Sequence, residues 1–323
     1  AVIALTCGEP AGIGPEIAAG AWARLRGRVP FFLIGDPAHL PEGTPVTVID
    51  DPAEAARAGA EALPVLGHPF AGRRTPGRPQ AAQAQGVVDV IARGVDLVQN
   101  GQATALCTAP IHKQALQEGA GFAFPGHTEY LAHLAGGCRV AMMLAGPSLR
   151  VVPATIHMPL SEVPRALTPE VVEETIRITR AALIRDFGLP APRLVVAGLN
   201  PHAGEGGRMG REDIEVIAPV LDRLRAEGMD LRGPLSADTM FHARARAGYD
   251  AAIAMYHDQA LIPIKTLDFD LGVNVTLGLP FVRTSPDHGT AFDIAGQGEA
   301  DPGSLIAALE MAETLTRARG AGG

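Results

Sequence analysis

Residues 249–290 decide the fold, and they read YDAAIAMYHDQALIPIKTLDFDLGVNVTLGLPFVRTSPDHGT. Two apolar runs are present, 251–255, which stops at polar residues, and 273–279, which is followed farther on by Arg283, and a short linker is expected between them. The polar residues that follow the runs or lie in the linker are Tyr256, His257, Asp258, Lys265 and Arg283. Polar side chains placed just after apolar runs are typical of ligand binding at the carboxyl ends of strands in an α/β sheet.

The rest of the chain continues this alternation of apolar runs and helical patterns. Residues 2–7 predict a strand that is apolar on both faces, as in the centre of a parallel sheet. The runs 140–144 and 149–155 predict a hairpin. Further strands are expected at 29–34, 46–49, 103–108 and 194–199, and helices at 80–99, 169–187 and 211–225. Strands that alternate with helices indicate α/β architecture.

Composition excludes several classes of protein. The 323 residues carry a net charge of −8 with scattered arginines, which argues against nucleic acid or an anionic membrane as partner. No apolar run reaches the roughly 18 residues that span a bilayer, and we expect no secretory leader. Three cysteines without metal-type spacing, Cys7, Cys107 and Cys138, fit reduced thiols in a cytoplasmic protein.

Three histidines share one context, because His157, His202 and His257 each lie just beyond a strand-like apolar run. Imidazoles that converge from strand ends could hold a divalent metal and leave one position open for substrate. The alternative is that each histidine caps a strand or bonds a backbone group.

Two glycine-rich segments follow predicted strands. Residues 200–210 precede a helix start, where glycine lets backbone approach a ligand and free amides favour anions, although an ordinary flexible connection remains the alternative. Residues 8–14 have the spacing G-x-x-x-G-x-G. That spacing is not the dinucleotide fingerprint G-x-G-x-x-G, so a tight structural turn is the alternative there.

Basic and acidic residues near the deciding stretch suggest further roles. Lys265 and Arg283 flank the second apolar run, which contains Asn274, and together they could bind a phosphate or a carboxylate. Asp238 and Asp258 could orient a ligand or move protons. The alternatives are solvated surface residues for the basic pair and caps or turns for the acids.

Taken together, the motifs resemble the 4-hydroxythreonine-4-phosphate dehydrogenase family of pyridoxal phosphate biosynthesis. The matching segments run from Gly8 to Gly296 in the family's order: GEPAGIGPEI, TAPIHK, GHTEYLA, HMPL, LNPHAGEGGRMGREDIE, GPLSADTMF, YHDQALIPIK and GVNVTLGLPFVRTSPDHGTAFDIAG. GIGPE and HGTAFDIAG are also similar to the isocitrate and isopropylmalate dehydrogenases. This wider resemblance implies two α/β/α domains flanking an active-site cleft, with 1–120 plus 265–323 on the cofactor side and 121–264 on the metal and dimer side.

The resemblance also implies roles for individual residues. The metal ligands would be His157, His202 and His257, in a site shared between the subunits of a homodimer and holding zinc, magnesium or cobalt. The substrate contacts would be His127, Thr128, Lys265, Asn274 and Arg283. NAD or NADP would contact His288, Gly289 and Asp293.

The implied reaction is a metal-dependent oxidation of 4-phosphooxy-L-threonine by NAD or NADP. The resulting 3-keto acid would decarboxylate to 3-amino-2-oxopropyl phosphate, with Asp258 or Asp238 moving the proton. The alternatives within the dehydrogenases are a threonate or erythronate 4-phosphate, or an aromatic dihydrodiol, as substrate. Outside that class, the alternatives are an acyl- or phosphotransferase on a similar scaffold and a binding module without catalysis.

Overall fold

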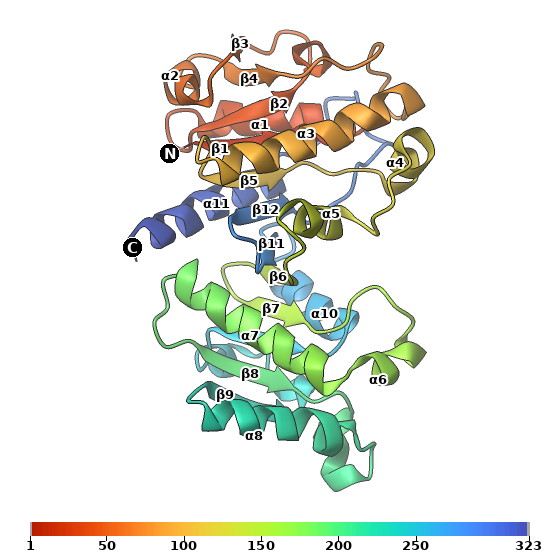
Figure 1. Cartoon of the computed structure of the whole chain (residues 1–323), viewed down its shortest axis with the longest axis vertical. Helices are drawn as coiled ribbons and strands as arrows, with labels where there is room; N and C mark the ends of the chain where they lie inside the picture. The colour runs from red at the N-terminus through yellow and green to blue at the C-terminus, as the bar shows by residue number, and fades with distance from the viewer. Residues whose placement is uncertain (1, 322–323) are drawn as a thin grey trace. The chain divides into compact units, whose positions relative to one another are not determined.

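A computed structural model describes residues 2–321, which form two compact α/β units (Figure 1). Unit 1 combines residues 2–138 with Leu279–Arg317, and unit 2 combines Arg139–Gly278 with residues 318–321. Both units alternate strands and helices, so the predicted α/β fold class is confirmed. None of the helices described is both long and apolar enough to cross a bilayer.

Unit 1 contains a fully parallel sheet with the strand order β3-β4-β2-β1-β5-β12. Its strands are β1 (Ile3–Thr6), β2 (Phe31–Gly35), β3 (Val46–Ile49), β4 (Leu63–Gly67), β5 (Ala105–Thr108) and β12 (Val282–Pro286). Every residue of β1 is buried, as expected for a central strand with helices on both faces. The predicted strands in this unit are therefore confirmed, with ends shifted by a residue or two.

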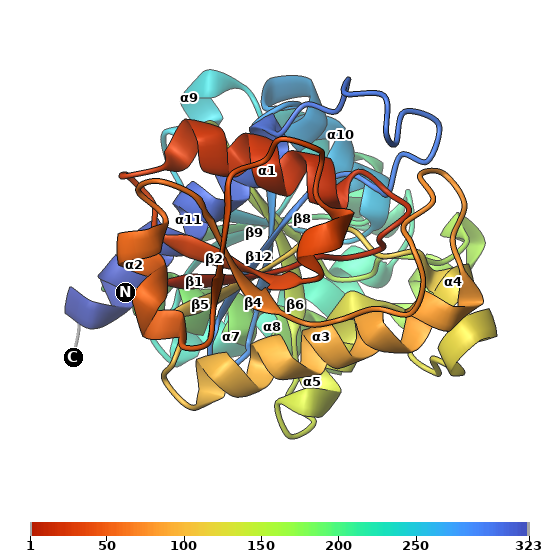
Figure 2. The same ribbon diagram turned by 90° about the horizontal axis from the view of Figure 1, so that it is seen from above.

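Helices cover both faces of the unit 1 sheet. Figure 2 shows α1 (Gly14–Leu25) and α3 (Ala81–Gln99) on opposite sides of β1, β2 and β5. The remaining helices of this unit are α2 (Ala55–Ala58), α4 (Lys113–Ala120), α5 (His127–Leu134) and α11 (Gly303–Ala321), whose residues up to Arg317 are assigned to unit 1. Helix α11 is held to β12 because the Thr284 hydroxyl donates to the Ala308 carbonyl at 2.8 Å.

The glycine-rich turn after β1 packs closely against neighbouring backbone. Gly8 has φ +68, and a Cβ there would lie 2.3 Å from the Pro110 carbonyl oxygen. Farther along the turn, the Ile13 amide donates to the Thr290 carbonyl at 3.0 Å. The turn is therefore closed by neighbouring backbone on two sides, as the structural alternative predicted.

Unit 2 contains a mixed sheet with the strand order β11-β6-β7-β10-β8-β9. Its strands are β6 (Ala141–Ala145), β7 (Arg150–Pro153), β8 (Arg193–Ala197), β9 (Asp230–Leu235), β10 (Ala251–Ala254) and β11 (Val273–Leu277). Strands β6 and β7 form the predicted hairpin, and β6 also pairs antiparallel with β11. Strands β7, β10, β8 and β9 run parallel, so their carboxyl ends lie at one edge of the sheet.

The helices of unit 2 are α6 (Val163–Ala166), α7 (Pro169–Arg185), α8 (Ala218–Ala226), α9 (Ala243–Arg246) and α10 (His257–Leu267). In Figure 1, α7 and α8 lie in front of β8 and β9. Helix α7 begins as predicted, because the Thr168 hydroxyl accepts from the Val171 amide at 3.3 Å.

Two segments of unit 2 differ from the sequence expectation. The expected linker around Lys265 is helix α10, which continues through Pro263 and buries Ala260 and Ile264 on one face. That apolar face gives the helix tertiary packing that offsets the missing proline N–H. The helix expected over 211–225 begins as a π-helix, Asp213–Ile217, before α8, because Pro219 cannot donate the usual bond one turn back.

Candidate functional site

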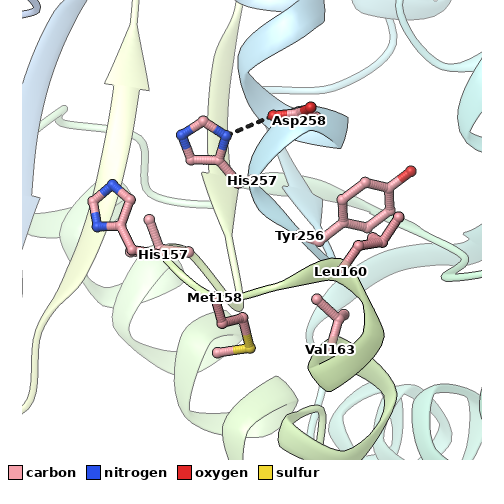
Figure 3. A pocket seen from close by; sticks show the side chains of 8 residues that line it. His157, Met158, Leu160, Val163, Tyr256, His257 and Asp258 are labelled. Carbon is pink, nitrogen blue, oxygen red and sulfur yellow. Dashed lines mark hydrogen bonds and ion pairs between the residues drawn. The ribbon is translucent and has the colours of Figure 1, made fainter.

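Two of the three strand-end histidines lie side by side in unit 2. His157 follows β7 and His257 opens α10 directly after β10, the strand that pairs with β7. Their ring centroids are 5.7 Å apart with the planes inclined by 45° (Figure 3). We call His157 and His257 the imidazole pair. Neighbouring parallel strands place these side chains at the same edge of the sheet, as the sequence pattern predicted.

The neighbouring carboxylate of Asp258 orients one ring of the imidazole pair. Asp258 Oδ1 lies 2.7 Å from Nδ1 of His257, as Figure 3 shows. A carboxylate at Nδ1 fixes a proton there and leaves Nε2 with a free lone pair, the arrangement that metal-ligating histidines use. The imidazole pair lines a cavity of about 340 Å³ together with apolar and aromatic side chains that include Met158, Val163 and Tyr256.

His202 is carried by a left-handed turn after β8. Residues 202–206 all have positive φ within the segment Pro201–Gly207, and the His202 side chain is exposed. Among residues 2–321 no three His, Cys, Asp or Glu side chains are assembled as a metal cluster. Within one chain the structure thus brings together two of the three predicted ligands.

The buried carboxylate of Asp213 braces the His202 turn. It accepts from the Leu199 amide at 2.8 Å, from the Asn200 amide at 3.4 Å and from the Asn200 side chain at 2.8 Å. Packing here is tight, because a Cβ on Gly198 would lie 2.6 Å from an Asp213 oxygen. Hydrogen bonds thus hold the start of the glycine-rich segment at Leu199 and Asn200, whereas His202, Glu205 and Gly206 are exposed.

Unit 1 contains a second polar centre, formed by Arg283, Thr108 and His127, which we call the anion centre. The guanidinium of Arg283 is buried, and its Nε and Nη2 donate to the Thr108 hydroxyl at 3.2 and 2.6 Å. Burial lowers the pKa of Arg283 to about 10, so the side chain still carries its charge near neutral pH.

His127 opens helix α5 beside this guanidinium. Burial, and then the charge of Arg283, lower the pKa of His127 well below its ordinary value, so the ring is neutral near pH 7. Its Nε2 is buried and has no hydrogen-bond partner among the described residues. A buried cation next to an unsatisfied ring nitrogen suits an anionic group that also carries a hydroxyl. Thr128, the next residue of α5, is half-buried.

The other predicted substrate contacts lie in unit 2. Asn274 in β11 has a buried Oδ1 that lacks a hydrogen-bond partner within the part of the chain described. Lys265 lies in α10 with Nζ 6.0 Å from the ring centroid of Phe269. The candidate acid Asp238 is exposed and accepts from the Ser236 hydroxyl at 2.6 Å.

The predicted cofactor residues follow β12 in unit 1. His288 Nδ1 lies 3.0 Å from the Gly289 carbonyl, while its Nε2 is buried without a partner among residues 2–321. Asp293 is exposed. Sequence reasoning missed the adjacent Phe292, whose ring lies 4.9 Å from that of His112 and borders a cavity of about 340 Å³. Both rings lie in quoted motifs, TAPIHK and HGTAFDIAG, but nothing in those motifs shows that they stack.

Comparisons with known proteins agree with the motifs. Residues 29–312 match the family model of the pyridoxal phosphate biosynthetic protein PdxA. The 4-hydroxythreonine-4-phosphate dehydrogenase of Roseobacter denitrificans is 66% identical over 313 residues, which cover 97% of this chain and 96% of the relative.

Solved structures show the same relationship. A 4-hydroxythreonine-4-phosphate dehydrogenase from Klebsiella pneumoniae has a TM-score of 0.88 at 39% identity, covering 98% of this chain and 99% of that one. A terephthalate 1,2-cis-dihydrodiol dehydrogenase from Burkholderia xenovorans has a TM-score of 0.67 at 30% identity, covering 97% of each chain. The resemblance found in the sequence is confirmed: the chain belongs to the PdxA family of pyridoxal phosphate biosynthetic proteins.

Proposed function

We propose that the chain oxidises 4-phosphooxy-L-threonine with NAD or NADP, and that the 3-keto acid decarboxylates to 3-amino-2-oxopropyl phosphate. The observation that carries this proposal is the imidazole pair, with Asp258 at the back of His257. The names of the relatives agree with it, because they are 4-hydroxythreonine-4-phosphate dehydrogenases.

The donor set of the imidazole pair fits a divalent cation. Neutral imidazoles suit zinc or cobalt, whereas magnesium prefers oxygen ligands. When bound, such a cation would lower the pKa of the substrate hydroxyl and stabilise negative charge that develops on the same oxygen. Since a single chain assembles only two of the predicted imidazoles among its described residues, we propose a homodimer in which two subunits complete one site.

The anion centre would hold a charged end of the substrate. A guanidinium in a buried setting binds a phosphate or carboxylate more strongly than one in water, because the local dielectric is low. Neutral His127 would pair its orphaned Nε2 with a substrate donor. Thr128, Lys265 and Asn274 are the further contacts that we propose.

The proton from the substrate hydroxyl would pass to Asp258 or Asp238. Asp258 is already bonded to His257, so its lone pairs are partly engaged, whereas Asp238 faces solvent. The nicotinamide cofactor would contact His288, Gly289 and Asp293. The Nε2 atom of His288 is buried without a hydrogen-bond partner among the described residues and could bond to the cofactor.

The test of the metal role compares two histidine variants. In His202→Ala we expect both bound cobalt and the rate of nicotinamide reduction to fall by at least tenfold. His242→Ala is the matched control, because this exposed ring of unit 2 accepts from the Ala245 amide at 3.1 Å and is outside the predicted ligand set. Survival of both cobalt content and turnover in His202→Ala would show that the metal proposal is wrong.

The substrate is tested by assaying one protein sample against three alcohols. We expect nicotinamide reduction with 4-phosphooxy-L-threonine to exceed that with threonate 4-phosphate or with a terephthalate dihydrodiol. The third compound is included because the chain is similar to the dihydrodiol dehydrogenase structure. Faster nicotinamide reduction with either of the other alcohols would show that the proposed substrate is wrong, although the protein would still be a dehydrogenase.

A further inference from the structure

Gln259 bridges two of the strand ends that carry histidines. Its side-chain oxygen accepts from the Met255 amide at 2.7 Å, at the end of β10. Its side-chain nitrogen donates to the Gly198 carbonyl at 2.9 Å, at the end of β8. A primary amide donates and accepts at once, so one side chain joins both backbones.

This bridge is the middle of a longer chain of hydrogen bonds. On one side, the buried Thr155 hydroxyl donates to the Met255 carbonyl at 2.7 Å, which ties the end of β7 to that of β10. On the other side, the two residues after Gly198 are bonded to Asp213, whose carboxylate accepts from the amides of Leu199 and Asn200. The three strand ends that lead to His157, His257 and His202 are thus joined by side chains that bond backbone.

The His202 turn needs such an anchor because its backbone is strained. His202, Ala203 and Glu205 have φ values of 54, 50 and 44. A residue with a Cβ loses roughly 1–2 kcal/mol in this conformation, so the turn persists only while its surroundings hold it. The carbonyl of Gly198, which precedes this turn in the chain, accepts a hydrogen bond from Gln259.

We propose that Gln259 is a positioning residue that ties the His202 turn to the strand end carrying His257. It presets the place of His202 before any cation arrives, so that binding does not have to order the turn. This inference rests on the proposed function only in giving the histidines their role as ligands.

The experiment uses Gln259→Met, which keeps the side-chain length and removes both hydrogen bonds. Gln80→Met is the matched control, because the Gln80 amide also holds a loop, donating to the Arg73 carbonyl at 2.8 Å and the Thr75 hydroxyl at 2.9 Å. Hydrogen exchange of residues 198–207 is followed in metal-free protein, and cobalt affinity is measured by competition with a chelator. Thermal unfolding is recorded for both variants.

In Gln259→Met we expect hydrogen exchange across 198–207 to speed up by about tenfold or more. The cobalt Kd should rise by about tenfold, which is the usual loss of affinity when a residue that positions a metal ligand is removed. Gln80→Met should show neither change, even if its melting temperature falls as much as that of Gln259→Met. Gln259→Glu separates the two bonds, because a carboxylate still accepts from the Met255 amide but cannot donate to Gly198. Its exchange across 198–207 should rise as in the Met variant.

Wild-type exchange across 198–207 in both Gln259 variants would overturn the proposal, and so would an unchanged cobalt Kd in Gln259→Met. If the wild-type protein binds no cobalt, the proposed metal role fails instead. The exchange data would then decide by themselves whether Gln259 holds the turn.

Discussion

The anion centre and the imidazole pair solve opposite problems. Arg283 in the anion centre is buried within unit 1, and its donors are fixed by the Thr108 hydroxyl. In the imidazole pair, His157 is exposed and His257 is oriented by a carboxylate that itself faces solvent. In the function that we propose, the first centre would gain binding strength from a low local dielectric, whereas the second would depend on the orientation of its imidazoles.

This difference teaches where each centre is vulnerable. Removing a buried charge takes away an interaction that water cannot replace. Removing a contact that orients an imidazole leaves the ring able to bind a cation and only widens the range of positions that the ring adopts. We therefore expect large, all-or-none effects from changes in the anion centre and graded effects around the imidazole pair.

The largest effect is expected from Arg283→Met. We propose that Arg283 binds the charged end of the substrate, and one charge-assisted hydrogen bond of about 1.5–3 kcal/mol corresponds to a fall in kcat/KM of roughly 10- to 100-fold. Stability should fall by about 1–3 kcal/mol, because the buried Thr108 hydroxyl loses both guanidinium donors. Steady-state kinetics and a melting curve check both statements.

Arg24→Met is the control for this variant, since Arg24 is an exposed arginine of unit 1, 3.8 Å from Asp301. Cobalt affinity should stay unchanged in both variants. A kcat/KM for Arg283→Met within a few-fold of wild type would remove Arg283 from the site.

A graded effect is expected from Asp258→Asn. The carboxylate that fixes the His257 ring is replaced by a neutral amide, and such supporting groups are worth 10- to 100-fold in metal affinity. We expect the cobalt Kd to rise by about tenfold in a chelator competition, while Asp270→Asn, an exposed acid of the same unit, leaves it unchanged. An equal Kd in the two variants would mean that Asp258 does not orient the ligand.

The smallest effect concerns stability against pH. Because the pKa of His127 is lowered in the folded chain, the unfolded chain binds more protons as pH falls below about 6.5. Stability is thus complete above that pH and declines below it. His127→Gln should make the decline shallower by at most about 1.4 kcal/mol per pH unit, the slope of one proton.

Urea unfolding at several pH values between 5 and 8 measures this slope. His133→Gln, on the exposed side of the same helix, is the control. Since burial also lowers the pKa of His39 and His68, part of the slope should persist in the variant. A slope identical to that of wild type would show that His127 titrates normally in the folded chain.

The sequence predicted those parts of the fold that depend on local pattern. Apolar runs located most strands of both units, but β4, β9 and β12 were not predicted. The hairpin β6–β7 and the Thr168 cap were read from turn and capping residues. It missed helix α10, because Pro263 and the polar residues around Lys265 resemble a linker locally. Only packing of Ala260 and Ile264 against the rest of unit 2 makes that segment helical.

The site was predicted less completely than the fold, for a physical reason. Strand ends indicated where histidines could meet, and the β7–β10 pairing does bring His157 and His257 together. The left-handed turn that carries His202 could not be foreseen, since Ala203 and Glu205 disfavour positive φ. Gln259 was missed too, because its role lies in two backbone groups far apart along the chain.

X-ray absorption of cobalt-loaded protein tests the central claim most directly. In wild type we expect a cobalt shell that contains imidazole nitrogen, and in His257→Ala a shell with at least one imidazole fewer or no bound cobalt at all. The same imidazole content in His257→Ala, at the same cobalt occupancy, would contradict the account, because the cation would then lie away from the imidazole pair.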